Sequence, residues 1–206
     1  MSTRVNFLPD ERFLSLRSAL KERLDKMAEV LTPENLGAVF DLRIENVLRD
    51  AFDQVRADEG SVWLLDPRQE SLVIAYNTGT HAEEIVGFKQ PIGSGIVSTS
   101  LASEQGFAEN EVYRHELHSR LLDDRLSLTT YAMIVVPFYF LNACRGVISC
   151  VQLFNVRREA GQTLPVGPVP PGFDLEQLNL IKRASLVISD LIDYRLLRIT
   201  VGWDGH

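Results

Sequence analysis

The feature that most constrains the fold of this chain is a pair of long apolar segments within residues 131–155, separated by a short gap. The first, 131–141, reads YAMIVVPFYFL, and the second, 145–155, reads RGVISCVQLFN, with a turn-prone gap at Asn142. Runs rich in Val, Ile, Phe and Tyr on either side of such a gap are typical of a β-hairpin. Apolar residues occupy both odd and even positions, so both faces need cover. We therefore expect this hairpin at the centre of a sheet with helices or a ligand pocket on each side.

A proline and two cysteines lie in or beside these segments. Pro137 has no N–H to donate to a neighbouring strand, so we expect a bulge or an unpaired edge position there. Cys144 and Cys150 lie six residues apart on one predicted strand, which is roughly 20 Å at about 3.3 Å per residue and too far for a disulfide. Reduced thiols are consistent with a reducing compartment. Arg145 could lower the pKa of the Cys144 thiol, which would make it the more reactive of the two.

Size and composition narrow the class of protein. A chain of 206 residues with 45% hydrophobic and 24% charged residues suits one domain with extensions. The net charge of −7 argues against nucleic acid or an anionic membrane as the main partner. No apolar run approaches the roughly 20 residues of a membrane span, and the first ten residues lack the apolar core of a signal peptide. We expect a cytoplasmic protein.

Apolar periodicity predicts a helix at each end of the chain and one more near the start. Residues 11–31 form an amphipathic helix, and Thr32 before Pro33 ends it and caps a second helix that closes at Gly60. The last helix covers 174–199. Between the second and the last helix we expect strands at 61–66 and 71–77, a short third strand at 89–92 and a helix at 96–103. An extended segment at 107–110 and a loose helix and loop over the sheet at 111–126 should follow, and 156–172 should form a long exposed loop rich in Pro and Gly.

This order of elements resembles that of a GAF domain, and particular residues carry the resemblance. Residues 92–110 are similar to the family's glycine-containing helix and the short segment after it. Residues 132–155 are similar to a Val-Pro strand, a turn and a Gly-Val strand that ends in Asn, and 173–188 are similar to the closing helix. The resemblance covers about residues 33 to 198. It implies an α+β fold, with a central antiparallel sheet of five or six strands, N- and C-terminal helices on one face, and short helices and loops over a pocket on the other.

The resemblance also implies a division of the chain and a function. We expect an N-terminal amphipathic helix at 1–32, a GAF domain at 33–199 and a tail at 200–206. GAF domains host many ligands, and some host none. We expect a non-enzymatic sensory or regulatory module that binds a small molecule between the sheet and residues 92–130 and signals through its helical ends to a separate effector protein. The ligand and any cofactor stay open.

The expected ligand site combines aromatic residues, which would stack on a planar ligand, with polar residues that would bind its edge. Glu109, Asn110 and Gln152 are the predicted polar contacts. The remaining predicted lining residues are Ile92, Phe107, Tyr113, Tyr131 and Met133.

Cyclic-nucleotide binding is one alternative that the family suggests. Its cyclic-nucleotide binders carry Asn, Lys, Phe, Asp and Glu from the last strand into the closing helix. This chain keeps Asn155 and Phe173, but Val156 replaces the lysine, and the acidic pair falls at Gln177 and Leu178. The signature is therefore incomplete.

Four further alternatives concern other ligands, a reductase activity or no ligand at all. A bilin thioether at its usual place in the family is excluded, because residues 81–130 contain no cysteine. The family's reductase of free methionine sulfoxide needs a thiolate and a resolving thiol in the pocket region, whereas Cys144 and Cys150 lie outside that region. A ligand-free dimerisation scaffold stays open. His115 and His118 with Glu116 are placed for a metal or haem, but we favour exposed histidines on a solvated helix.

We also expect a parallel homodimer through the first and last helices. Leu16, Leu20, Leu24 and Met27 lie before the predicted domain, and Ile188, Ile192 and Leu196 extend the last helix beyond the sheet. An exposed apolar stripe on an isolated helix is unfavourable in a monomer. The alternative is that both helices fold back on the sheet of their own subunit.

Overall fold

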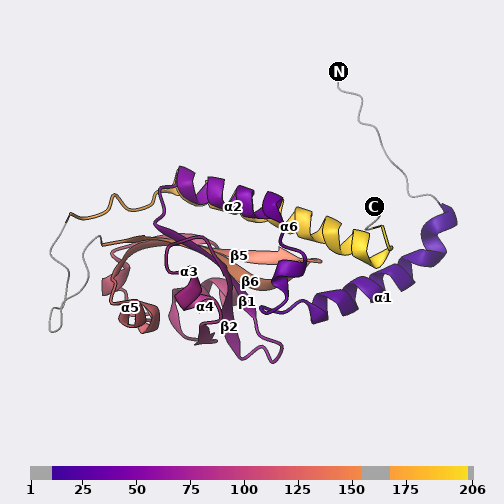
Figure 1. Cartoon of the computed structure of the whole chain (residues 1–206), viewed down its shortest axis with the longest axis horizontal. Helices are drawn as coiled ribbons and strands as arrows, with labels where there is room; N and C mark the ends of the chain where they lie inside the picture. Colours follow the sequence, from indigo (N-terminus) through magenta and orange to yellow (C-terminus); the bar gives the residue numbers. More distant parts are fainter. Residues whose placement is uncertain (1–10, 155–167, 204–206) are drawn as a thin grey trace, which may run out of the picture.

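Strand pairing builds one antiparallel sheet of six strands in the order β3-β2-β1-β6-β5-β4, seen edge-on in Figure 1. The computed structural model describes residues 11–154 and 168–203. The strands are β1 Glu59–Leu65, β2 Ser71–Asn77, β3 Lys89–Pro91, β4 Phe107–Asn110, β5 Thr130–Phe140 and β6 Ala143–Leu153. The helices are η1 Glu11–Phe13, α1 Leu14–Val30, η2 Leu36–Ala38, α2 Leu42–Gln54, α3 Ala82–Ile85, α4 Gly95–Ser103, η3 Val112–Arg114, α5 Leu121–Leu126 and α6 Leu175–Thr200.

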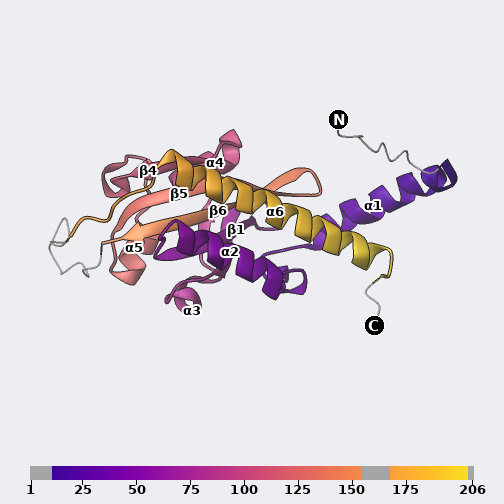
Figure 2. The same ribbon diagram turned by 90° about the horizontal axis from the view of Figure 1, so that it is seen from above.

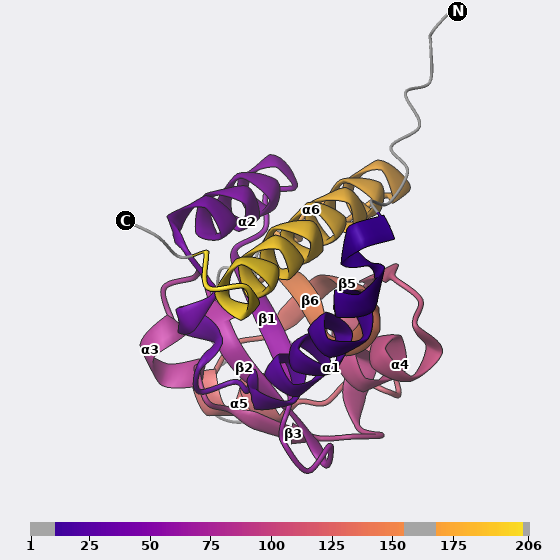
Figure 3. The same ribbon diagram turned by 90° about the vertical axis from the view of Figure 1, so that its right-hand side faces the viewer.

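The sheet separates two layers of helices. α2 and α6 cover one face, and the short helices α3, α4 and α5 lie on the other (Figure 3). This arrangement confirms the predicted α+β class, the six strands and the short helices opposite the closing helix. No helix within the described ranges has the length and apolar character that a membrane span needs.

The β5–β6 hairpin lies at the centre of the sheet, as predicted, and is buried on both faces. Its two-residue turn places Leu141 and Asn142 at φ of 50° and 60°, the geometry of tight hairpin turns, in which Asn is favoured. On β5, Ile134 packs into the core beneath α2 and α6, whereas its neighbours Met133 and Val135 pack into the core beneath the short helices. Both sets of positions must be apolar because each one faces a different core.

Pro137 occupies a position that tolerates a missing N–H. It pairs with Val147 of β6, but the pairing of β4 with β5 ends at Val135. Beyond that residue β5 has no β4 partner, and its register with β6 shifts between Phe138 and Tyr139. The expectation of an edge position or a bulge at Pro137 is therefore confirmed.

Helix α6 begins at a well-formed cap. Asp174 accepts a hydrogen bond from the Gln177 backbone N–H at 2.9 Å, and the Gln177 side chain accepts one from the Asp174 backbone. These reciprocal bonds satisfy two N–H groups that the helix itself cannot pair. The start of the last helix is thus where the sequence predicts it.

The second predicted helix starts later than its sequence suggests. α2 begins at Leu42 rather than Pro33, because Asp41 accepts hydrogen bonds from the backbone N–H groups of Arg43 and Ile44 and so caps the helix there. Gly60 does not end this helix; it lies inside β1. The exposed loop predicted over 156–172 lies mostly outside the described residues, at 156–167.

Helix α1 packs on its own subunit at one end and projects at the other. Ala28 is buried, and the Thr200 hydroxyl of α6 donates to the Met27 sulfur at 2.7 Å. Toward the N-terminus, Phe13 and Leu16 are 61% and 57% exposed, and the helix extends away from the sheet (Figures 1 and 2).

The predicted dimer stripe on the last helix requires a correction. Ile188, Ile192 and Leu196 do not extend beyond the sheet: they are 0%, 0% and 2% exposed and belong to the core of their own subunit. The spacing of three and four residues is the same for a helix face against a sheet and for a dimer face, so the sequence pattern could not separate the two. Exposed apolar residues lie on the other side of α6, among them Leu186, Val187, Tyr194 and Leu197.

We predict that Gly146→Ala strongly destabilises the fold. A Cβ at residue 146 of β6 would overlap the carbonyl oxygen of Trp63 on the paired strand β1. Overpacking of a well-packed interior typically costs about 1–3 kcal/mol, and more where backbone must move. Urea unfolding should show this loss. Gly37→Ala is the matched control, since no atom lies within 4 Å of its added Cβ; equal stabilities for the two variants would contradict the prediction.

Candidate ligand-binding site

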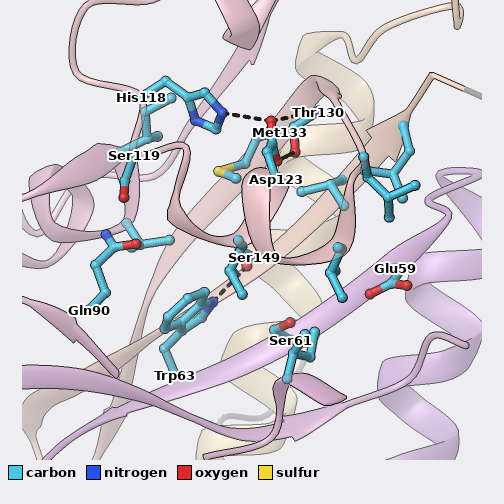
Figure 4. A pocket seen from close by; sticks show the side chains of 18 residues that line it. Glu59, Ser61, Trp63, Gln90, His118, Ser119, Asp123, Thr130, Met133 and Ser149 are labelled. Atoms are coloured by element: carbon cyan, nitrogen blue, oxygen red, sulfur yellow. Dashed lines mark hydrogen bonds and ion pairs between the residues drawn. The ribbon is translucent and has the colours of Figure 1, made fainter. Parts of the chain in front are cut away.

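A small cavity of about 80 Å³ lies between the sheet and the segment that carries α4 and α5 (Figure 4). Alternate residues of β1 and β6 form its floor, while α3, α4, α5 and the loops around them form its walls. The lining residues are Glu59, Ser61, Trp63, Ile85, Gln90, Ile96, Val97, His118, Ser119, Leu122, Asp123, Leu126, Leu128, Thr130, Met133, Ser149, Val151 and Leu153.

Asp123 fixes α5 over this cavity. Its Oδ2 accepts the Thr130 backbone N–H at 3.0 Å, and its Oδ1 accepts the Thr130 hydroxyl at 2.7 Å. His118 Nε2 lies 3.1 Å from Asp123 Oδ2, and both side chains are buried, with 5% and 9% of their surface exposed. These contacts tie a one-and-a-half-turn helix, which could not be stable alone, to the first residue of β5.

The structure corrects the expectation for the histidines. His118 is not an exposed residue on a solvated helix, because its ring packs into the cavity wall against Asp123. His115 accepts the Leu117 backbone N–H at 3.2 Å. Among the described residues, no group of three His, Cys, Asp or Glu side chains is arranged to hold a metal ion.

Trp63 anchors the floor of the cavity. Its Nε1–H donates to the Ser149 hydroxyl of β6 at 2.9 Å, and its ring meets Phe88 edge-on at 6.3 Å between centroids. The side chain is almost fully buried, so this hydrogen bond satisfies an N–H that would otherwise be costly to bury. Ser149 keeps its own hydroxyl proton, which can be donated into the cavity.

Glu59 closes one end of the cavity. The residue is buried, with 7% of its surface exposed. Its Oε1 contacts His81 Nδ1, and its Oε2 lies 3.4 Å from the Asn77 amide nitrogen. The turn after β2 covers it closely, and a Cβ at Gly79 would overlap the Glu59 side chain. Glycine at residue 79 therefore allows the backbone to seal this end.

The cavity is mainly apolar, and its charges are mainly negative. Glu59 and Asp123 supply two carboxylates, and no Lys or Arg occurs among the lining residues that the structure describes. His118 is the basic side chain in the lining, and it is bonded to Asp123. A ligand here would contact apolar surface over most of its area and would meet carboxylate, hydroxyl and amide groups at its ends.

Of the eight ligand-contact residues predicted from the sequence, Met133 lines this cavity. Asn110 instead fixes the start of α6: its amide donates to the Phe173 carbonyl at 3.0 Å and accepts the Phe173 N–H at 2.8 Å. Gln152 accepts the Gly172 N–H at 2.8 Å and donates to the Arg56 carbonyl at 3.3 Å. The polar groups of both side chains are thus bonded to backbone.

The other predicted residues lie outside the cavity. A register shift between Thr130 and Ala132 turns Tyr131 away from the face of β5 that carries Met133. The Tyr131 ring instead packs with the rings of Tyr113 and Phe154, and the ring centroids lie 5.4 to 6.4 Å apart. Phe107 packs into the core beside the cavity, whereas Glu109 is half-buried on the edge strand β4 and Ile92 is 40% exposed.

Sequence reasoning missed Glu59, Trp63, Asp123 and Ser149. A usable signal was present for two of them: Ser149 interrupts an apolar strand, and Glu59 precedes one. A polar residue on a strand that is buried on both faces implies a partner or a cavity. Asp123 could not be found in this way, because acidic residues are common on short exposed helices.

Both cysteines lie away from the cavity lining. Cys150 is buried in the core beneath α2 and α6, and burial raises the pKa of its thiol. Burial likewise raises the pKa of Cys144, so the expectation that Arg145 activates this thiol is wrong. The Arg145 guanidinium instead stacks over the Phe140 ring at 5.1 Å.

No family model matches the sequence, and the curated proteins contain no match to it. Among solved structures, the GAF domain of a phosphoenolpyruvate-protein phosphotransferase from Coxiella burnetii superposes with a TM-score of 0.57 at 12% identity, covering 94% of this chain and 99% of that one. The second GAF domain of DevS from Mycobacterium smegmatis gives 0.53 at 18% identity, with 82% and 99% covered.

A third similar structure is an enzyme. The free methionine-R-sulfoxide reductase from Neisseria meningitidis, in complex with its substrate, superposes with a TM-score of 0.50 at 16% identity, covering 95% of this chain and 96% of that one. Likeness at such low identity establishes the fold. The chain therefore has the fold of a GAF domain, as its sequence predicts.

We predict that Asn110→Ala lowers the free energy of unfolding by roughly 1–3 kcal/mol, because the two backbone groups of Phe173 lose their partner. Chemical denaturation measures this loss. Asn46→Ala, at an exposed position of α2, is the matched control and should have little effect. An Asn110→Ala protein as stable as the control would show that this side chain does not fix the start of α6.

Proposed function

We propose that this chain, which has the fold of a GAF domain, is a non-enzymatic sensory or regulatory module of the cytoplasm that binds a small molecule in the cavity under α5 and signals through its helical ends to a separate effector protein. The cavity supports the proposal most directly. It is mainly apolar and carries a few polar groups, which is the usual composition of a small-molecule site.

The size of the cavity indicates that binding involves movement of α5. Its volume of about 80 Å³ is well below the roughly 300–1,000 Å³ of pockets that hold drug-sized ligands. α5 is six residues long and is held at its base by the contacts of Asp123 with Thr130. A ligand larger than a few atoms would displace this helix, and the displacement would be the first step of the response.

Strand β5 supplies a physical connection from the cavity to α6. Met133 lines the cavity, whereas the adjacent Ile134 packs into the core beneath α6. The carbonyl of Pro137 on the same strand accepts a hydrogen bond from the Ser185 hydroxyl of α6 at 3.2 Å. A shift of β5 caused by a ligand would therefore move the residues on which α6 rests.

The lining favours binding over the two chemical alternatives. Reduction of a sulfoxide requires a reactive thiolate, and no cysteine lines the cavity. A cyclic nucleotide carries a phosphate, and within residues 11–154 and 168–203 no Lys or Arg lines the cavity to neutralise it. A ligand-free scaffold stays the alternative that binding experiments must address.

We predict that at least one compound from a metabolite library stabilises the purified protein against heat. A ligand at 100 times its dissociation constant adds about 2.7 kcal/mol of stability. The effect should be lost in Met133→Trp, which fills the cavity, and kept in Ile92→Trp, which lies outside it. A library without a stabilising compound, or one whose effect survives in Met133→Trp, would favour the scaffold.

The module is proposed to act as a homodimer, with an interface that differs in part from the sequence-based one. Phe13, Leu14 and Leu16 are 50% to 61% exposed on the projecting part of α1. On α6, Leu186 and Leu197 are 63% and 37% exposed on the side away from the sheet. Pairing of two copies through these residues would cover apolar surface that is unfavourable in water.

We predict that Leu16→Glu combined with Leu197→Glu converts the dimer into a monomer, as measured by light scattering. Two buried charges on each side of an interface cannot be accommodated without partners. Leu175→Glu is the control: this residue is 69% exposed at the opposite end of α6 and should leave the mass unchanged. A parent protein that is monomeric would refute the interface.

A further inference from the structure

We infer, on the premise that the cavity binds a ligand as proposed above, that the ligand is a small organic cation whose ammonium group donates to the carboxylate of Glu59. The chemical class would be a primary amine with a short apolar body. The geometry of Glu59, the charge of the lining and the volume of the cavity each point to this class.

Glu59 has hydrogen-bonding capacity that its neighbours do not use. An ionised carboxylate has about four acceptor sites on its two oxygens. Oε1 of Glu59 contacts His81 Nδ1, but Oε2 is approached by the Asn77 amide at 3.4 Å, which is long for a hydrogen bond. The same Asn77 amide donates to the Ser61 hydroxyl at the shorter distance of 2.9 Å. Oε2 is therefore a buried acceptor that lacks a strong donor among the described residues.

Asp123, the other carboxylate of the cavity, provides an internal comparison. It is buried to a similar degree, but three groups approach it within 3.1 Å: the backbone N–H and hydroxyl of Thr130, and His118 Nε2. Its acceptor sites serve to hold α5 in place. Glu59, set apart from Asp123 in the lining (Figure 4), is the carboxylate left to bind a ligand.

The charge of the lining selects the sign of the ligand. Burial of a carboxylate is unfavourable unless a cation or several donors compensate it. Among the described residues, no Lys or Arg side chain lines the cavity, and the ion-pair partner of Glu59 is His81, which contacts Oε1 from outside the lining. An ammonium ion would supply the donor that Oε2 of Glu59 lacks, and its charge would be opposite to that of the carboxylate. A ligand carboxylate or phosphate would instead meet two carboxylates of its own sign.

The rest of the cavity fits a short apolar body. Trp63, Leu122, Leu126 and Met133 contribute apolar surface to the lining. The volume of the cavity is only about 80 Å³. A compact alkylamine therefore requires less displacement of α5 than a nucleotide or a tetrapyrrole would.

The two tryptophans provide a site-specific measurement. Trp63 lines the cavity and is 3% exposed, whereas Trp203 is 70% exposed near the C-terminus and serves as an internal control. The indole N–H signals of the 15N-labelled full chain are followed by NMR during titration with n-butylammonium chloride, 1-butanol or sodium butyrate at constant ionic strength and pH. These probes share an apolar body and differ in charge.

We expect butylammonium to shift the Trp63 signal saturably and to leave the Trp203 signal in place. Butanol and butyrate should bind at least about tenfold more weakly, since a hydrogen bond to a charged group contributes about 1.5–3 kcal/mol. Glu59→Gln should weaken butylammonium binding by a similar factor without affecting butanol. Glu84→Gln, which neutralises an exposed carboxylate on α3, is the matched control and should change nothing.

Two results would overturn the inference. If butanol or butyrate shifts Trp63 at concentrations equal to or below those of butylammonium, the cavity binds ligands but does not select a cation, and the proposed sensory function stands. If none of the three probes shifts Trp63 saturably, the cation class is wrong, and the library experiment with Met133→Trp decides the proposed function separately. Should Glu59→Gln fail to fold, the comparison of the three probes on the parent protein still decides the sign of charge.

Discussion

Burial of the β5–β6 hairpin on both faces is the constraint on which the rest of the structure depends. The hairpin has no side that can face water, so the chain must supply two covers: α2 with α6 on one face, and α3, α4 and α5 on the other. The first cover is built from the longer helices. The second is built from short helices, and the cavity lies beneath them. Core and candidate site are therefore two consequences of the same pair of strands.

Most of the fold could be predicted because its strongest determinants are local. The apolar runs of β5 and β6, the Pro- and Asn-containing turns and the long periodic pattern of α6 each indicate one structure. Failures occurred where two structures share one pattern. Thr32 before Pro33 and Asp41 before Leu42 are both plausible helix starts, and the hydrogen bonds of Asp41 decide between them. Likewise, the spacing of Ile188, Ile192 and Leu196 fits either a dimer face or a core face. In the structure these residues are buried in the core against the sheet.

The candidate site was less predictable, because its lining depends on which face each strand residue occupies. A single register shift near Thr130 removes Tyr131 from the cavity while Met133 stays within it. Polar residues chosen for their chemistry, such as Asn110 and Gln152, are bonded to backbone from distant parts of the chain, at Phe173, Gly172 and Arg56. Such long-range bonds leave no local pattern. Ser149, a polar residue within an apolar strand, is the type of signal that does identify a buried polar site.

The attachment of α1 at one end has a mechanical consequence. Its contacts with α6 lie near Met27 and Ala28, while its first turns extend free of the sheet. A helix of 17 residues is about 25 Å long at 1.5 Å per residue. Rotation about the attached end by about 10° would displace the far end by roughly 4 Å, a distance close to one helical turn. Under the proposed function, α1 would act as a lever arm that converts a small rearrangement of the core into a larger movement at its far end.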